Sequence, residues 1–101
     1  MKRYQLTEAA DRQLREIWVY SRDRWGAARA HAYLAEIDTA LSAALATPAL
    51  LRPRPELGEG IVARKAGSHV AYCVIQTDTL LVIGVLHSRM DPRRHLLWRS
   101  D

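Results

Sequence analysis

Hydrophobic and polar positions change their spacing along the chain, and the longest apolar run lies near the C-terminal end. Residues 80–86, Leu-Leu-Val-Ile-Gly-Val-Leu, are continuously apolar and rich in β-branched side chains. A short run without polar alternation is typical of a strand buried on both faces, and Gly84 disfavours a helix interior. We therefore predict a central strand here, which delivers the polar residues after it to one end of a sheet.

The N-terminal half has the periodicity of helices. Residues 2–6 alternate weakly and predict a short strand, after which Thr7 is a favourable N-cap. Apolar positions then recur every three or four residues in two segments, with Gly26 between them and Pro48 after the second. This pattern predicts two antiparallel helices joined at Gly26. Their apolar faces are Ala10, Leu14, Ile17, Ser21 and Trp25, and then Ala30, Leu34, Ile37, Leu41, Ala44 and Leu45.

The second helix has another face that carries only small, uncharged residues. Alanine is the best helix former, which is the simpler explanation of this face. Small residues also let another helix approach closely, either the first helix or one from a partner. The residues are Ala28, Ala32, Ala35, Thr39, Ser42, Ala43 and Ala46.

The rest of the chain predicts strands separated by turns. Residues 47–60 hold three of the four prolines and predict a loop. Residues 61–66 and 69–77 predict two strands joined by a Gly67–Ser68 turn, and Asp78–Thr79 leads into the central strand. The order β-α-α-β-β-β predicts a single α+β domain over residues 1–101, with an antiparallel sheet packed against an N-terminal helical hairpin.

Charge is distributed unevenly between the two halves. The net charge is +4, and residues 52–101 carry eight Lys or Arg against five Asp or Glu, with three of the four His. A basic half favours an anionic partner, although a solubilising surface also explains it. No apolar run approaches the roughly 20 residues of a membrane span, and the lone Cys73 cannot form an internal disulfide. We therefore expect a cytoplasmic protein that makes no membrane contact.

Motifs for cofactor or metal chemistry do not occur in the chain. It has no phosphate-binding loop, no dinucleotide fingerprint and no diagnostic zinc-ligand spacing, so we expect no cofactor and no metal site. Cys73 lies in an apolar stretch and is expected to be a core thiol of raised pKa.

Phosphate chemistry is the remaining option. Cleavage of RNA without metal needs proton-transfer groups and cations around the phosphate. Arg64 and Lys65 are neighbours in a strand and point to opposite faces, so only one of them can join a given cluster. The candidate cations are Arg64, Lys65, Arg89, Arg93 and Arg94, and the candidate proton-transfer groups are His69, His87, His95 and Tyr72.

Several motifs resemble those of ParE-type toxins of bacterial toxin–antitoxin modules. The clearest is His87-x-Arg89-Met90-Asp91 followed by Arg94-His95-Leu96, within residues 82–96. The resemblance implies a fold of the RelE/ParE superfamily and a toxin that a cognate antitoxin neutralises. Shorter matches are Leu14-x-x-Ile17-Trp18-x-Tyr20, Trp25-Gly26 with Tyr33, and Gly67-Ser68-His69 with Tyr72.

Two functions occur in this superfamily. ParE relatives poison DNA gyrase, whereas RelE relatives cut messenger RNA on the ribosome with a basic cluster and a proton-transfer residue near the C-terminus, often tyrosine. This chain has no tyrosine after Tyr72. We therefore expect a protein inhibitor of gyrase that serves plasmid or chromosome maintenance, not an enzyme. The alternative is a metal-independent, ribosome-dependent endoribonuclease that uses Arg64, His87, Arg89 and His95.

The resemblance also implies binding surfaces. A ParD-like antitoxin, acidic and with a DNA-binding N-terminus, is expected on the small-residue face, and through it the complex contacts DNA. Within the tail, we expect Asp91 to pair with a neighbouring arginine, and Leu96, Leu97 and Trp98 to pack back on the domain. The expected antitoxin contacts are Ala28, Ala32, Ala35, Thr39 and Trp18, and the expected gyrase contacts are Arg89, Met90, Asp91, Arg93, Arg94 and His95.

Overall fold

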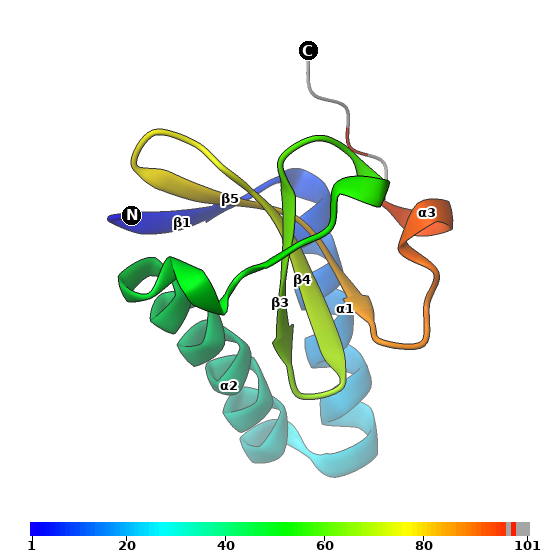
Figure 1. Cartoon of the computed structure of the whole chain (residues 1–101). Helices are drawn as coiled ribbons and strands as arrows, with labels where there is room; N and C mark the ends of the chain where they lie inside the picture. The colour runs from blue at the N-terminus through cyan, green and yellow to red at the C-terminus, as the bar shows by residue number, and fades with distance from the viewer. Residues whose placement is uncertain (97, 99–101) are drawn as a thin grey trace.

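A computed structural model describes residues 1–96 and 98, and it shows two long helices against one face of a five-stranded sheet (Figure 1). The α+β class and the order of the predicted elements are confirmed. Two short 3-10 helices, Pro48–Leu50 and Pro55–Leu57, lie in the proline-rich segment. The remaining elements are β1 (Arg3–Leu6), α1 (Glu8–Trp25), α2 (Ala27–Ala46), β2 (Arg52–Pro53), β3 (Ile61–Ala66), β4 (His69–Ile75), β5 (Thr79–His87) and α3 (Pro92–His95).

The sheet has the order β1-β5-β4-β3-β2. Strands β3, β4 and β5 form the predicted antiparallel meander, whereas β1 pairs with β5 in parallel. The predicted central strand, β5, is an interior strand between β1 and β4. Strand β4 ends at Ile75, earlier than predicted, because residues 76–78 form the turn into β5.

Strand β2 corrects the prediction that residues 47–60 form only a loop. Arg52 lies opposite Ala63, and Pro53 lies opposite Val62, at the edge of the sheet. Two residues are too few to show apolar alternation, and one of them is a proline. Proline lacks a backbone N–H and is tolerated in a sheet mainly on edge strands, which is where Pro53 lies.

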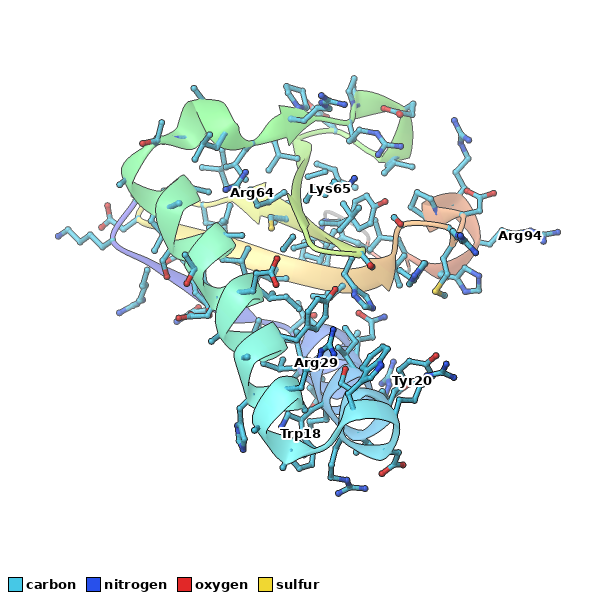
Figure 2. The ribbon with its side chains drawn as sticks, turned by 90° about the horizontal axis from the view of Figure 1, so that it is seen from below. Trp18, Tyr20, Arg29, Arg64, Lys65 and Arg94 are labelled. Atoms are coloured by element: carbon cyan, nitrogen blue, oxygen red, sulfur yellow. The ribbon has the colours of Figure 1, made fainter. Side chains whose placement is uncertain are left out.

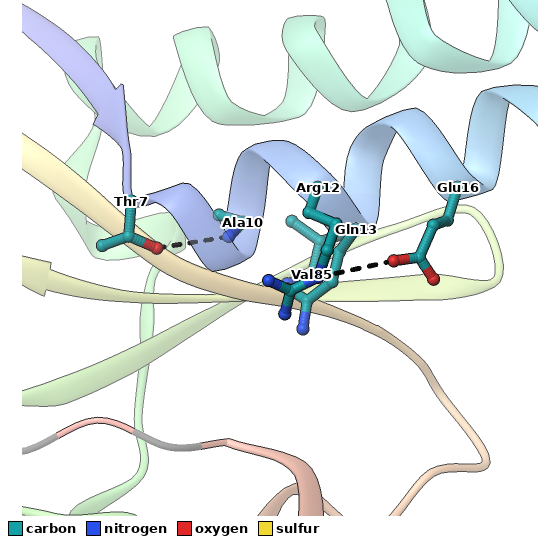
Figure 3. A network of polar contacts seen from close by, with 6 residues as sticks. All are labelled: Thr7, Ala10, Arg12, Gln13, Glu16 and Val85. Atoms are coloured by element: carbon teal, nitrogen blue, oxygen red, sulfur yellow. Dashed lines mark hydrogen bonds and ion pairs between the residues drawn. The ribbon is translucent and has the colours of Figure 1, made fainter.

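The helical hairpin begins and ends at the predicted residues. The Thr7 hydroxyl accepts a hydrogen bond from the Ala10 N–H (3.2 Å, Figure 3), and Gly26, with φ of 93°, ends α1 and precedes α2. The prediction that Trp25 belongs to the buried face is wrong, since its side chain is 52% exposed. Trp25 is the last residue of α1, where the hairpin passes beyond the sheet (Figure 1).

Both faces of β5 are buried, as predicted, because a different layer covers each one. The helices cover the face that contains Leu80, Val82 and Val85. The other face contains Ile83 and Leu86, and it is covered by three residues that return to it, Leu57, Leu96 and Trp98. The predicted packing of Leu96 and Trp98 is therefore confirmed, whereas Leu97 lies outside the described residues.

An irregularity in β5 connects these two layers. Tyr72 faces Gly84 and Cys73 faces Val82, so Ile83 is an extra residue without a partner on β4. Two residues after it, the Val85 N–H donates to Gln13 Oε1 of α1 (2.7 Å). A β-carbon at Gly84 would lie 2.6 Å from Leu96 Cδ1, so glycine is what lets Leu96 lie against the strand.

We predict that Gln13→Leu lowers the free energy of unfolding by about 1–3 kcal/mol, because it leaves the buried Val85 N–H without an acceptor. Urea unfolding at neutral pH measures this change. The control is Gln76→Leu, an exposed position in the β4–β5 turn, which should change stability by less than about 0.5 kcal/mol. Equal effects of the two substitutions would contradict a specific role of the Gln13 amide.

Candidate functional site

The chain leaves the sheet at His87 and continues as a cationic tail, which we define as residues 88–96. Backbone hydrogen bonds fix its first turn: Ser88 N–H donates to Ser68 O (2.8 Å), and Met90 N–H donates to His87 O (2.9 Å). The Arg89 N–H also donates to His87 Nδ1 (3.1 Å). The start of the tail is therefore held at a defined place beside the β3–β4 turn.

The carboxylate of Asp91 orders the second half of the tail. Its Oδ1 accepts a hydrogen bond from the Arg93 backbone N–H (3.0 Å), so Asp91 is the N-cap of α3, and Pro92 is the first helical residue. The prediction that Asp91 pairs with an arginine side chain is wrong for the described residues, where no ion pair includes Asp91. Arg89, Arg93 and Arg94 are exposed, and within the described residues their side chains form no ion pair. Arg94 points away from the domain (Figure 2).

A groove of about 840 Å³ lies between the helical hairpin, the ends of β4 and β5, and the cationic tail. Ile17, Val85 and Leu86 are apolar residues of its lining. Around them are aromatic and basic side chains from the hairpin, together with Met90 and His95 of the tail. The groove and the tail therefore form one continuous surface.

Tyr33, His69 and His87 form a cluster that lines this groove and is held by hydrogen bonds and edge-to-face ring contacts. The Tyr33 hydroxyl oxygen accepts from the Ser68 N–H (3.0 Å) and lies 2.5 Å from His69 Nδ1. The His69 and His87 rings meet edge to face, with centroids 5.3 Å apart. Gly67 has φ of 58°, and a β-carbon there would lie 2.6 Å from Tyr33 Cε1, so the turn residue allows the close approach of Tyr33.

One of these contacts fixes a tautomer. The Arg89 backbone N–H can only donate, so His87 Nδ1 is an acceptor and the neutral His87 ring carries its proton on Nε2. The Tyr33 hydroxyl accepts from the Ser68 N–H and shares a second hydrogen bond with His69 Nδ1, in which the donor depends on the His69 tautomer. Burial, and next the charge of His87, lower the pKa of His69, so this ring is a neutral N–H donor near pH 7.

The structure brings together only some of the residues named for the endoribonuclease alternative. His87 and His95 line the groove with His69, and Arg89 adjoins them. Arg64 lies elsewhere, where its Nε donates to Ala40 O of α2 (2.9 Å). Tyr72 is buried on the face of the sheet that Leu57, Leu96 and Trp98 cover. Cys73 is also buried, and burial raises its pKa to about 12, as expected of a core thiol.

The helical half of the groove is not predicted by the apolar pattern of the sequence. Tyr20, Trp25 and Arg29 line it, although Trp25 had been placed in the core and Arg29 had no role. Their position on either side of Gly26, where the two helices join, was the feature of the sequence that could have indicated this surface. Residues at the tip of a helical hairpin extend beyond the sheet and are free to line a surface.

The small-residue face of α2 is exposed, apart from the half-buried Ala43. The helix α1 packs elsewhere on α2 and does not cover this face, so the small residues do not serve contact between these two helices. Trp18 flanks the face, since its half-buried ring meets His31 of α2 edge to face with centroids 5.6 Å apart. The five residues predicted to bind the antitoxin therefore lie on neighbouring parts of one surface.

In residues 1–96 and 98, no three His, Cys, Asp or Glu side chains come together as a metal site would require. No helix in this part of the chain is long and apolar enough to cross a membrane.

Comparisons with known proteins agree on one family. Residues 4–92 match the family described as ParE toxin of type II toxin-antitoxin system, parDE. The chain is 42% identical to Toxin ParE1 of Mycobacterium tuberculosis, covering 93% of this chain and 97% of that protein. It is 33% identical to Toxin ParE1 of Caulobacter vibrioides, covering 95% and 99% respectively. A solved structure, the chromosomal ParDE TA system from P. aeruginosa, shares the fold with a TM-score of 0.71 at 13% identity, over 86% of this chain and 95% of that chain.

We predict that His69 makes the protein less stable in acid. Its pKa is lowered in the folded state, so the unfolded chain binds the proton more tightly, and the free energy of unfolding falls as pH drops through the window just below 6.5. His69→Asn removes this proton uptake while keeping an acceptor for Tyr33. The stability advantage of the unmodified protein over this variant should shrink between pH 7.5 and pH 5, as measured by urea unfolding. A difference that does not change with pH would contradict the prediction.

Proposed function

The chain belongs to the ParE toxin family of type II toxin–antitoxin systems, and we propose that it inhibits DNA gyrase and is neutralised by a ParD-like antitoxin. The observation that carries this proposal is the family match over residues 4–92, with relatives named Toxin ParE1 aligned over nearly their whole length. Fold alone would not support it, because related folds host different functions.

The cationic tail suits binding rather than catalysis. The side chains of Arg89, Arg93 and Arg94 form no ion pair within the described residues, and they project from a segment fixed at Asp91 and Leu96. Exposed arginines bind carboxylate or phosphate with charge-assisted hydrogen bonds. Such a surface would act by stabilising one state of gyrase, the one that holds cut DNA. Gyrase works on chromosomal and plasmid DNA, so this function places the toxin in the cytoplasm.

The small-residue face of α2 is the surface we assign to the antitoxin. An exposed helix face without charges accepts an amphipathic partner helix, because small side chains let two helices approach closely. An antitoxin segment that folds on binding would cover a large area at the cost of its ordering. The antitoxin's own DNA-binding N-terminus would then link the complex to DNA.

One observation favours a second candidate, the ribosome-dependent endoribonuclease. His69 and His87 touch each other in a groove that also contains His95, and histidines are the commonest groups for proton transfer. Purified toxin that cleaves ribosome-bound messenger RNA and leaves gyrase active would establish this candidate instead.

We predict that Arg89→Ala and Arg94→Ala each weaken inhibition of gyrase supercoiling by about tenfold, a graded loss typical of single binding contacts. Their melting temperatures should be nearly unchanged, because both side chains are exposed. By contrast, Leu96→Ala should lower stability by about 2 kcal/mol, at the low end for leucine because Leu96 is half buried.

The matched control for the tail is Arg52→Ala, which removes an exposed cation at the far edge of the sheet and should keep full inhibition. Supercoiling assays with purified toxin and gyrase, paired with thermal melts, test all four variants. If both tail variants inhibit gyrase as well as the unmodified protein, the tail is not the gyrase-binding surface.

We predict that the double variant Ala32→Arg with Ala35→Arg loses antitoxin binding by at least about a hundredfold while the toxin stays folded, because two large charges would lie in the helix contact. Calorimetric titration with the cognate antitoxin measures the loss. The control places two arginines outside α2, Ala49→Arg with Gln76→Arg, both at exposed positions. Equal affinity of the two double variants would remove this face of α2 from the interface.

A further inference from the structure

Two aromatic rings stand exposed at the tip of the helical hairpin, where solvent contact is unfavourable for large apolar groups. Tyr20 is 57% exposed and Trp25 is 52% exposed, with ring centroids 6.2 Å apart and planes at 80°. Both line the groove, and Tyr20 projects outward from α1 (Figure 2). Each ring therefore keeps about half of its surface exposed to solvent, although guanidinium groups lie over part of both rings.

Arginines surround these rings. The guanidinium carbon of Arg24 lies 5.4 Å from the Tyr20 centroid and 5.7 Å from the Trp25 centroid, and that of Arg29 lies 5.6 Å from the Trp25 centroid. Within the described residues, neither Arg24 nor Arg29 forms an ion pair. Their charges are therefore available to an anion beside the rings.

Farther along the groove, the donors outnumber the acceptors. His87 presents an Nε2 proton, because the Arg89 backbone N–H donates to its Nδ1 atom. Glu16 is the one carboxylate among the described residues that line the groove, and it is paired with Arg12 (3.6 Å). The groove as a whole therefore favours an anion.

The cationic surface is long rather than compact. Arg29 at the hairpin tip and Met90 and His95 of the tail line the same groove, together with His69 and His87. The tail then adds exposed arginines beyond the groove. A single phosphate ion would use only one part of this surface, whereas a chain of phosphates would use all of it.

We propose that this groove binds single-stranded nucleic acid, with a base stacked on Tyr20 or Trp25 and phosphates held by Arg29 and the tail arginines. Aromatic platforms beside a cationic track are the general means of binding single strands without sequence preference. A volume of about 840 Å³ is that of a small-ligand site, enough for about one or two nucleotides and too small for a duplex. An acidic peptide would neutralise the cations but would leave the exposed rings without a planar partner.

This inference goes beyond the proposed function, since it concerns a ligand of the toxin itself and holds whether gyrase or the ribosome is the target. Cut DNA and messenger RNA offer the same chemistry, phosphates joined to unstacked bases. The test therefore uses oligo-dT and oligo-U of 12 nucleotides, each with a fluorescent label, and measures their anisotropy as purified full-length toxin is added.

We predict that Trp25→Ala and Arg29→Ala each weaken binding of at least one of the two oligonucleotides by about tenfold or more. Trp25→Phe, which keeps a ring, should restore most of the affinity. Arg29→Ala should also reduce the slope of log affinity against log salt by about 0.7, whereas Trp25→Ala should leave that slope unchanged. The control Arg3→Ala removes an exposed cation on β1 and should have no comparable effect.

Four results would each overturn the proposal. The first is no binding of either strand, and the second is an equal loss of affinity for Arg3→Ala and Arg29→Ala. The third is equal competition by a duplex of the same length. The fourth is binding of a 12-residue polyglutamate with the same affinity and the same dependence on Trp25, which would make the groove a docking site for acidic protein. Both test side chains are exposed, so the variants should stay folded, and thermal melts check this.

Discussion

Burial of β5 on both faces is the constraint on which the rest of the structure depends. A strand without polar alternation leaves an apolar surface on each side of the sheet, and each surface must be removed from water. The helical hairpin covers one side, and Leu57, Leu96 and Trp98 cover the other. Because Leu96 must return to the sheet, the arginines between His87 and Leu96 are held between two anchored ends. The packing of the core thus determines where the charges of the tail lie.

Gly84 and Gln13 show how closely the two layers depend on each other. Glycine leaves room for Leu96 on the strand, and the extra residue Ile83 displaces the ladder so that the Val85 N–H is satisfied from α1. A substitution in one layer would therefore change the packing of the other layer. This arrangement also leaves the polar groups of the groove and the tail at the surface. Water solvates their charges there, so they have little effect on the free energy of unfolding.

Three exposed surfaces of the molecule belong to different elements. The small-residue face lies on α2, the groove lies between the hairpin and the ends of β4 and β5, and the cationic tail follows β5. The ParE family consists of toxins of toxin–antitoxin systems, and the proposals above assign separate surfaces to the antitoxin and to the target. All three surfaces are fixed to one core, so a chain of 101 residues holds them at defined places.

The sequence by itself determined the elements that local chemistry controls. Thr7, Gly26 and Gly67 set helix ends and a turn, and the apolar spacing identified the helices and the buried strand. It could not reveal β2, the exposure of Trp25, or Asp91 as a cap rather than an ion-pair partner. It also could not bring Tyr33, His69 and His87 together, since these residues are 36 and 18 positions apart along the chain. Only the tertiary structure decided these points. They depend on where the hairpin passes the edge of the sheet and on which backbone group lies nearest to a side chain, and a local sequence pattern carries no information about either.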